Sequence, residues 1–218
     1  MTYSQNWLFE LTLWVIPVLL AVKWRESAKA IVSHYRGDST AKMLGLGSIN
    51  IFKNLDPIGS VIAPFLLILK GQLPFGWARS FSIRPYFLNR GKFDVLIIIL
   101  SGFLANILMA IGWLWVDHLS TYIEWSPKLY TVLTHSAQNG IKINCMLIIA
   151  HCIPIFPMDI AVIIDMFLPR SLSSLYKLTE WIGPYVIFFI IFSNMYPQEL
   201  IANYKAVKDL MIQLSYIQ

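Results

Sequence analysis

The chain has 218 residues, of which 57% are hydrophobic and only 13% are charged. Soluble domains average about 45–50% apolar and about 25% charged residues, so this composition excludes a disordered chain or an ordinary soluble enzyme and indicates a membrane protein. The net charge is +5, but no clustered basic face of the kind used for nucleic-acid binding is evident, and no nucleic-acid partner is expected. The two cysteines, Cys145 and Cys152, form no C-x-x-C pair, so a cysteine-based zinc site is not expected either.

The first half of the chain divides into two predicted helices separated by a polar connector. The first helix is predicted from about Asn6 to Tyr35, apolar in its first half and charged in its second. In the connector that follows, a small strand element is expected near residues 42–52. Asp56 and Pro57 open the next helix, which is predicted over residues 58–69, because a proline in the first turn has no helical hydrogen bond to lose.

The second half begins with a basic, aromatic loop over residues 70–92, which is typical of a segment on a bilayer surface. Basic residues occur in both early connectors, so the positive-inside rule leaves the orientation open. Further helices are predicted over residues 93–116, 138–153, 158–168 and 172–196, and an amphipathic tail helix over residues 198–217.

These elements predict an all-α integral membrane protein with about five or six transmembrane helices. The chain is expected to be a single membrane domain, residues 1–218, with its core at about residues 20–185. The lipid bilayer is its expected partner, in a multi-pass arrangement.

Three charged residues interrupt the first predicted helix. Arg25, Glu26 and Lys29 lie within one turn of each other, and an ionisable group at membrane depth indicates function by default. The alternative is a charged helix end whose long side chains reach the membrane interface.

A second polar group lies near a segment broken by two prolines. Asp159 follows Pro154 and Pro157, and His151 precedes Asp159 by eight residues. A helix broken at membrane depth must be buried in protein or face water, which is typical of a site. The alternatives are that Asp159 is a helix N-cap and that His151 is a satisfied core residue.

Short motifs in a fixed order accompany these charges. They are Gly37-Asp38-Ser39-Thr40-Ala41, Asn54-Leu55-Asp56-Pro57-Ile58-Gly59, Gly76-Trp77-Ala78, Gly102-Phe103-Leu104-Ala105-Asn106, Asn144, and Pro154-Ile155-Phe156-Pro157-Met158-Asp159. Together they resemble the site-2 protease family of intramembrane zinc metalloproteases, in its compact form without a PDZ domain. The order and spacing match from about residue 20 to residue 185.

The resemblance assigns roles to positions of this chain. The family's H-E-x-x-H motif falls on Arg25-Glu26-Ser27-Ala28-Lys29, so Arg25 and Lys29 replace its two histidine ligands. Glu26 keeps the place of the general base and Asp159 that of the third ligand. His151 stands at the place of a family asparagine and is a possible extra ligand. Structural or groove positions are Asn106, Asn144, Asp56, Pro57, Pro154 and Pro157.

Zinc catalysis in this family needs two neutral imidazoles and a carboxylate that leave one position open for water. The metal lowers the pKa of that water from about 15.7 to about 7, and the glutamate accepts its proton. Arginine has no lone pair to give and lysine is a cation, so no catalytic zinc or other cofactor is expected here. We expect Arg25 and Lys29 to pair instead with Asp159 and Glu26.

The resemblance therefore predicts a catalytically inactive pseudoprotease that binds a membrane partner or a transmembrane segment. One alternative is an active intramembrane zinc metalloprotease with an atypical site built from Glu26, Asp159 and His151, in which case zinc is the cofactor. A third interpretation is a transporter-like protein. The expected location is a bacterial cytoplasmic membrane, and the oligomeric state stays open.

Overall fold

The computed structural model describes residues 7–48, 50, 55–79, 81–122 and 126–194. This described part of the chain is helical and contains no β-strand, and only an isolated antiparallel bridge joins Leu55 to Ala78.

The strand element expected near residues 42–52 is wrong for the residues described there. The short helix α2 (Thr40–Met43) occupies the start of this segment, and turns follow it. The backbone N–H of Gly45 donates to the Lys42 carbonyl at 2.9 Å, and the φ of Gly45 is +74°. A glycine adopts this left-handed conformation without a steric penalty, so the chain turns here instead of extending.

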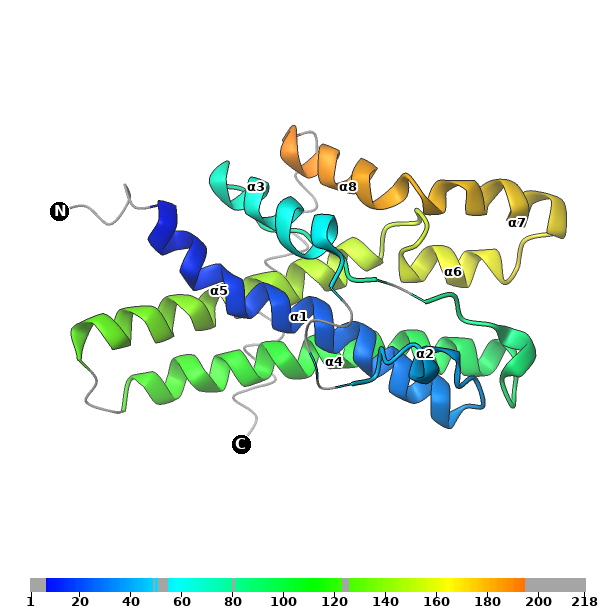
Figure 1. Cartoon of the computed structure of the whole chain (residues 1–218), viewed down its shortest axis with the longest axis horizontal. Helices are drawn as coiled ribbons and strands as arrows, with labels where there is room; N and C mark the ends of the chain where they lie inside the picture. Colours follow the sequence, from blue (N-terminus) through cyan, green and yellow to red (C-terminus); the bar gives the residue numbers. More distant parts are fainter. Residues whose placement is uncertain (1–6, 49, 51–54, 80, 123–125, 195–218) are drawn as a thin grey trace.

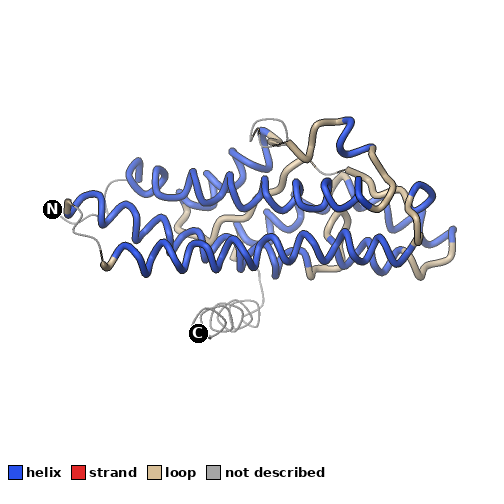
Figure 2. The backbone as a smooth tube through the Cα atoms, turned by 90° about the horizontal axis from the view of Figure 1, so that it is seen from below, coloured by secondary structure: helices blue, strands red, loops and turns tan. Residues whose placement is uncertain are grey.

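Three long helices form the body of an elongated molecule (Figure 2). α1 (Trp7–Tyr35) crosses the antiparallel pair α4 (Lys92–Ser120) and α5 (Pro127–His151), as Figure 1 shows. α4 and α5 pack closely because Gly140 of α5 lies against Trp113 of α4. A Cβ atom at Gly140 would lie 2.3 Å from the indole ring.

Two of these helices, α4 and α5, are longer than predicted. α1 ends at Tyr35 as predicted, but α4 runs to Ser120 and α5 begins at Pro127, both between the helices predicted over residues 93–116 and 138–153. The early start of α5 has a local cause, since Ser126 is its N-cap and Pro127 occupies its first turn.

Shorter helices cover one side of this body (Figure 1). η3 (Pro57–Ile62) and α3 (Ala63–Leu69) contact α1, α8 (Gly183–Phe192) contacts α3, and α6 (Asp159–Asp165) contacts α4. An apolar cluster joins α3 and α8 to α5. Its buried members include Leu67, Phe75, Met146, Met158 and Ile187.

The last predicted span, residues 172–196, is a bent segment in its described part. α7 (Arg170–Lys177) and η5 (Leu178–Glu180) meet α8 at an angle of 53°. The bend brings Gly183 against the preceding loop, where a Cβ atom would lie 1.7 Å from the Phe156 carbonyl oxygen. The predicted tail helix, residues 198–217, lies outside the described residues.

The expected number of transmembrane helices is also wrong. Among the described residues, one helix, α4, is long and apolar enough to cross a bilayer, and the bent segment α7–η5–α8 would add a second if it counted as one span. The other predicted spans fail for two reasons. The helical segment over residues 57–69 is too short for a hydrocarbon core of about 30 Å. α1 and α5 carry polar side chains where a span would be apolar: Lys23, Arg25, Glu26 and Lys29 on α1, and Gln138, Asn139, Lys142 and Asn144 on α5.

Candidate functional site

Four buried charges meet where α1 crosses α4 and the start of α6. Arg25, Glu26 and Lys29 come from the middle of α1, and Asp159 is the first residue of α6. Their exposed fractions are 2%, 5%, 6% and 1%. Charges at such depth are stable only when they are paired.

Asp159 is the centre of this cluster. The Nη2 group of Arg25 donates to its Oδ2 atom, and Nζ of Lys29 lies 3.0 Å from its Oδ1 atom. Lys29 also lies 3.3 Å from Oε1 of Glu26. The expected ion pairing is therefore present. Arg25 and Lys29 both pair with Asp159, and Lys29 also pairs with Glu26. Two cations and two anions leave the cluster neutral.

A chain of amides extends the cluster across α4 to α5. Nη1 of Arg25 donates to Oδ1 of Asn106, and Nδ2 of Asn106 donates to Oδ1 of Asn144 at 2.9 Å. Asn144 completes the chain by donating to the Gly140 carbonyl oxygen at 2.8 Å. Both asparagines are fully buried, and this network satisfies polar groups that would otherwise be costly to bury.

Gly102 of α4 makes room for the basic side chains. A Cβ atom at this position would lie 2.9 Å from Cδ of Lys29 and 3.5 Å from Cζ of Arg25. A larger residue would push the Lys29 side chain away from α4, so the glycine of the Gly-x-x-x-Asn motif belongs to the charge cluster.

His151 lies at the end of α5 and is 7% exposed. Its Nδ1 atom is 2.8 Å from the Leu147 carbonyl oxygen, the hydrogen bond of a histidine satisfied by its own helix. The ring also forms part of the wall of a cleft beside Glu26.

Two further motif pieces are packed against each other. Asp56 is the N-cap of η3, where its Oδ1 atom accepts a hydrogen bond from the Gly59 N–H at 2.6 Å, and Pro57 takes the first helical position. Gly59 lies against Trp77, whose ring would be 2.4 Å from a Cβ atom there. This close packing places Trp77 at the cleft.

The prolines of the broken segment have different positions. Pro157 lines the cleft. The Pro154 carbonyl oxygen accepts a hydrogen bond of 2.7 Å from the Tyr176 hydroxyl, which ties the loop to α7.

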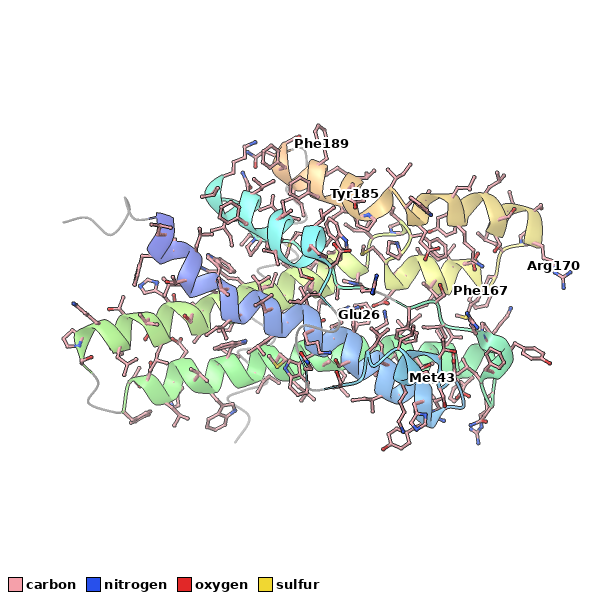
Figure 3. The ribbon with its side chains drawn as sticks, in the orientation of Figure 1. Glu26, Met43, Phe167, Arg170, Tyr185 and Phe189 are labelled. Atoms are coloured by element: carbon pink, nitrogen blue, oxygen red, sulfur yellow. The ribbon has the colours of Figure 1, made fainter. Side chains whose placement is uncertain are left out.

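The cleft beside Glu26 has a volume of about 360 Å³. Figure 3 shows Glu26 near the middle of the molecule, with Tyr185 of α8 above it. Of the two carboxylate oxygens of Glu26, Oε1 faces Lys29, whereas the buried Oε2 has no hydrogen-bond partner among the described residues.

Sequence reasoning did not identify the aromatic residues from the last predicted span as part of this cleft. Trp181 and Tyr185 line it, although the segment was interpreted as a plain membrane span. A signal was present, because the Gly183-Pro184 pair breaks that apolar run and marks the bend that brings both aromatic residues to the cleft.

Comparison with known proteins gives one informative similarity. The chain is 27% identical over 180 residues to YwhC of Bacillus subtilis (strain 168), a putative zinc metalloprotease, and the match covers 82% of this chain and 78% of that protein. No protein-family model and no solved structure matches the chain. The similarity supports a metalloprotease-like family.

The residues of this site do not fit a catalytic zinc ion. The Arg25 guanidinium, at the first ligand position, only donates hydrogen bonds, and here it donates to Asp159 and Asn106. Both oxygens of Asp159 face cations. Within the described parts of the chain, no group of three His, Cys, Asp or Glu side chains is arranged to hold a metal ion.

Proposed function

We propose that this chain is a membrane-bound, site-2-protease-like pseudoprotease, which has lost zinc-dependent hydrolysis and uses its cleft to bind a membrane partner or its transmembrane segment. The observation that carries the proposal is the pairing of Asp159 with both Arg25 and Lys29. α4 is long and apolar enough to anchor such a protein in a bilayer.

The charge balance explains why the fold tolerates the loss of the metal. In a zinc site, a divalent cation compensates the buried carboxylates. Here Arg25 and Lys29 supply two positive charges to Glu26 and Asp159. A zinc ion entering this cluster would have to displace both cations from Asp159, and like charges would meet in a medium of low dielectric constant. The same cluster that preserves the fold therefore opposes metal binding.

The cleft supports the binding role. It lies beside the general-base position, Glu26, and contains both apolar and polar groups. Its size is within the range of pockets that hold ligands in other proteins. The cleft does not depend on a bound metal, so a transmembrane segment that an active protease would hydrolyse is bound here without cleavage.

The proposal is tested by measuring metal content per chain and by restoring the motif. We expect less than one-tenth of a zinc ion per purified wild-type chain, and about one per chain in the double variant Arg25→His, Lys29→His. About one zinc per wild-type chain, lost in Asp159→Ala, would overturn the proposal in favour of an active metalloprotease with an atypical site.

A photo-crosslinking amino acid at Trp181 tests the binding role in intact membranes. Trp181 lines the cleft and is 86% exposed, whereas Leu108 on α4 is 59% exposed and is not part of the cleft. We expect one discrete adduct of defined mass from position 181 and none from position 108. Equal crosslinking from both positions would contradict a partner site in the cleft.

A further inference from the structure

One carboxylate oxygen in the cleft lacks a donor. Glu26 is 5% exposed, and its Oε2 atom is buried without a hydrogen-bond partner among the described residues. Leaving such an oxygen unpaired costs the full desolvation of a charged group. The atom belongs to a side chain that lines an open cleft of about 360 Å³. A hydrogen-bond donor on a ligand in the cleft can therefore pair with Oε2 of Glu26, which has no donor among the described residues.

Three aromatic side chains line the same cleft as Glu26. Trp77 and Tyr185 meet edge to face, with ring centroids 5.3 Å apart, and both line the cleft. Trp181 adds a third ring at the cleft, and 86% of this residue is exposed. Aromatic faces attract cations, and ammonium groups are held by such rings together with carboxylates in many proteins.

The charges of the cleft favour a cation over an anion. The three basic and three acidic side chains of its wall balance, and Asp159, which lies behind Arg25 and Lys29, adds one further negative charge. The wall residues are Arg25, Lys29 and Arg79 against Glu26, Asp56 and Glu180. An added cation would bring this set to neutrality.

We propose that the cleft binds one alkylammonium group, whose N–H donates to Oε2 of Glu26 and whose carbon body packs against Trp77, Trp181 and Tyr185. The inference rests on the proposed function, because a zinc ion beside Glu26 would exclude a second cation. The ammonium group belongs either to a soluble amine or to the ethanolamine headgroup of a phospholipid, and the two sources share the same recognition chemistry.

The test is calorimetric titration of the purified full chain with cyclohexylmethylammonium, with neutral cyclohexylmethanol as the matched probe. We expect saturable binding of the ammonium only. Glu26→Gln should weaken it by about tenfold or more, because a hydrogen bond between two charged groups is replaced by a weaker one. Glu10→Gln is the matched control, since Glu10 is exposed on the same helix, about 24 Å away at 1.5 Å per residue. Trp181→Ala should also weaken binding. Because Trp181 is exposed, its replacement should leave the packing of the core unchanged.

The zinc content of each titrated sample separates the two possible failures. Three results with zinc-free protein would overturn the ammonium site and leave the proposed function standing. They are binding of neither probe, equal binding of both probes, and equal binding of the ammonium by the wild type and Glu26→Gln. Protein with one zinc per chain would overturn both. Titration in nanodiscs with and without phosphatidylethanolamine identifies the source. If phosphatidylethanolamine competes with the probe, the site is assigned to the lipid headgroup. If it does not compete, the site is assigned to a soluble amine. Either result supports the ammonium site.

Discussion

Lys29 and Asp159 are separated by 130 residues in the sequence, yet Nζ of Lys29 lies 3.0 Å from Oδ1 of Asp159. This contact fastens the start of α6 to the middle of α1. Arg25 makes a second contact to the same carboxylate, one turn earlier on α1. The two ion pairs therefore join α1 to α6 at positions where the resemblance places metal ligands.

Asp159→Ala should destabilise the protein strongly. Its removal leaves Arg25 and Lys29 buried with only Glu26 to compensate them, and breaking a buried pair in this way costs about 3–5 kcal/mol. Thermal unfolding in detergent should show a large decrease in melting temperature. Glu10→Ala, at an exposed position of α1, is the control and should change the melting temperature little. An unchanged melting temperature for Asp159→Ala would mean that the cluster does not hold α6 in place.

Glu26→Gln should cost less stability than Asp159→Asn. Asp159 accepts from two cations through both oxygens, whereas Glu26 pairs with Lys29 alone, at 3.3 Å. Neutralising Asp159 therefore removes more electrostatic stabilisation from the same buried cluster. Both variants keep the shape of the side chain, so parallel melting curves compare the charges directly. A reversed order would show that Glu26 is the main partner of Lys29.

Two glycines of α4 offer a matched pair of substitutions. Gly102→Ala places a methyl group 2.9 Å from Cδ of Lys29, and overpacking of this kind costs about 1–3 kcal/mol. At Gly112 nothing lies within 4 Å of the added Cβ atom, so alanine should stabilise the helix by up to about 1 kcal/mol. Melting temperatures of the two variants should move in opposite directions. Equal shifts would contradict the close passage of Lys29 beside Gly102.

The sequence was most informative where one residue type admits few alternatives. Arginine and lysine cannot serve as zinc ligands at neutral pH, so their pairing with Asp159 could be predicted from charge once the resemblance had placed these residues at one site, and the structure contains both pairs. The amide chain from Asn106 to Asn144 could not be predicted in this way. The resemblance marked both positions, but only the crossing of α1, α4 and α5 shows that they join Arg25 to α5.

The errors come from features that local pattern does not encode. The strand near residues 42–52 was expected from a short polar and β-branched piece, but the described residues contain no strand, and a turn at Gly45 follows α2 at the start of this segment. Residues 49, 51 and 52 lie outside the described part of the chain. The spans were overcounted because helices with polar interruptions were still counted as transmembrane spans. The four charged side chains in the middle of α1, and Asn139 and Asn144 on α5, are buried inside the protein. Burial by protein and burial by lipid give similar composition, and only packing distinguishes them.

Lys177→Ala should have a small effect, which sets the scale for the buried cluster. Nζ of Lys177 lies 2.9 Å from Oδ2 of Asp165, a shorter distance than that between Lys29 and Glu26, but the Lys177 side chain is 51% exposed. Water and salt screen such a pair, and exposed pairs contribute about 0–1 kcal/mol. The difference in melting temperature between Lys177→Ala and the wild type should therefore shrink between low and high salt, whereas the effect of Asp159→Ala should persist. A Lys177→Ala effect as large as that of Asp159→Ala would mean that distance, rather than burial, decides the strength of these pairs.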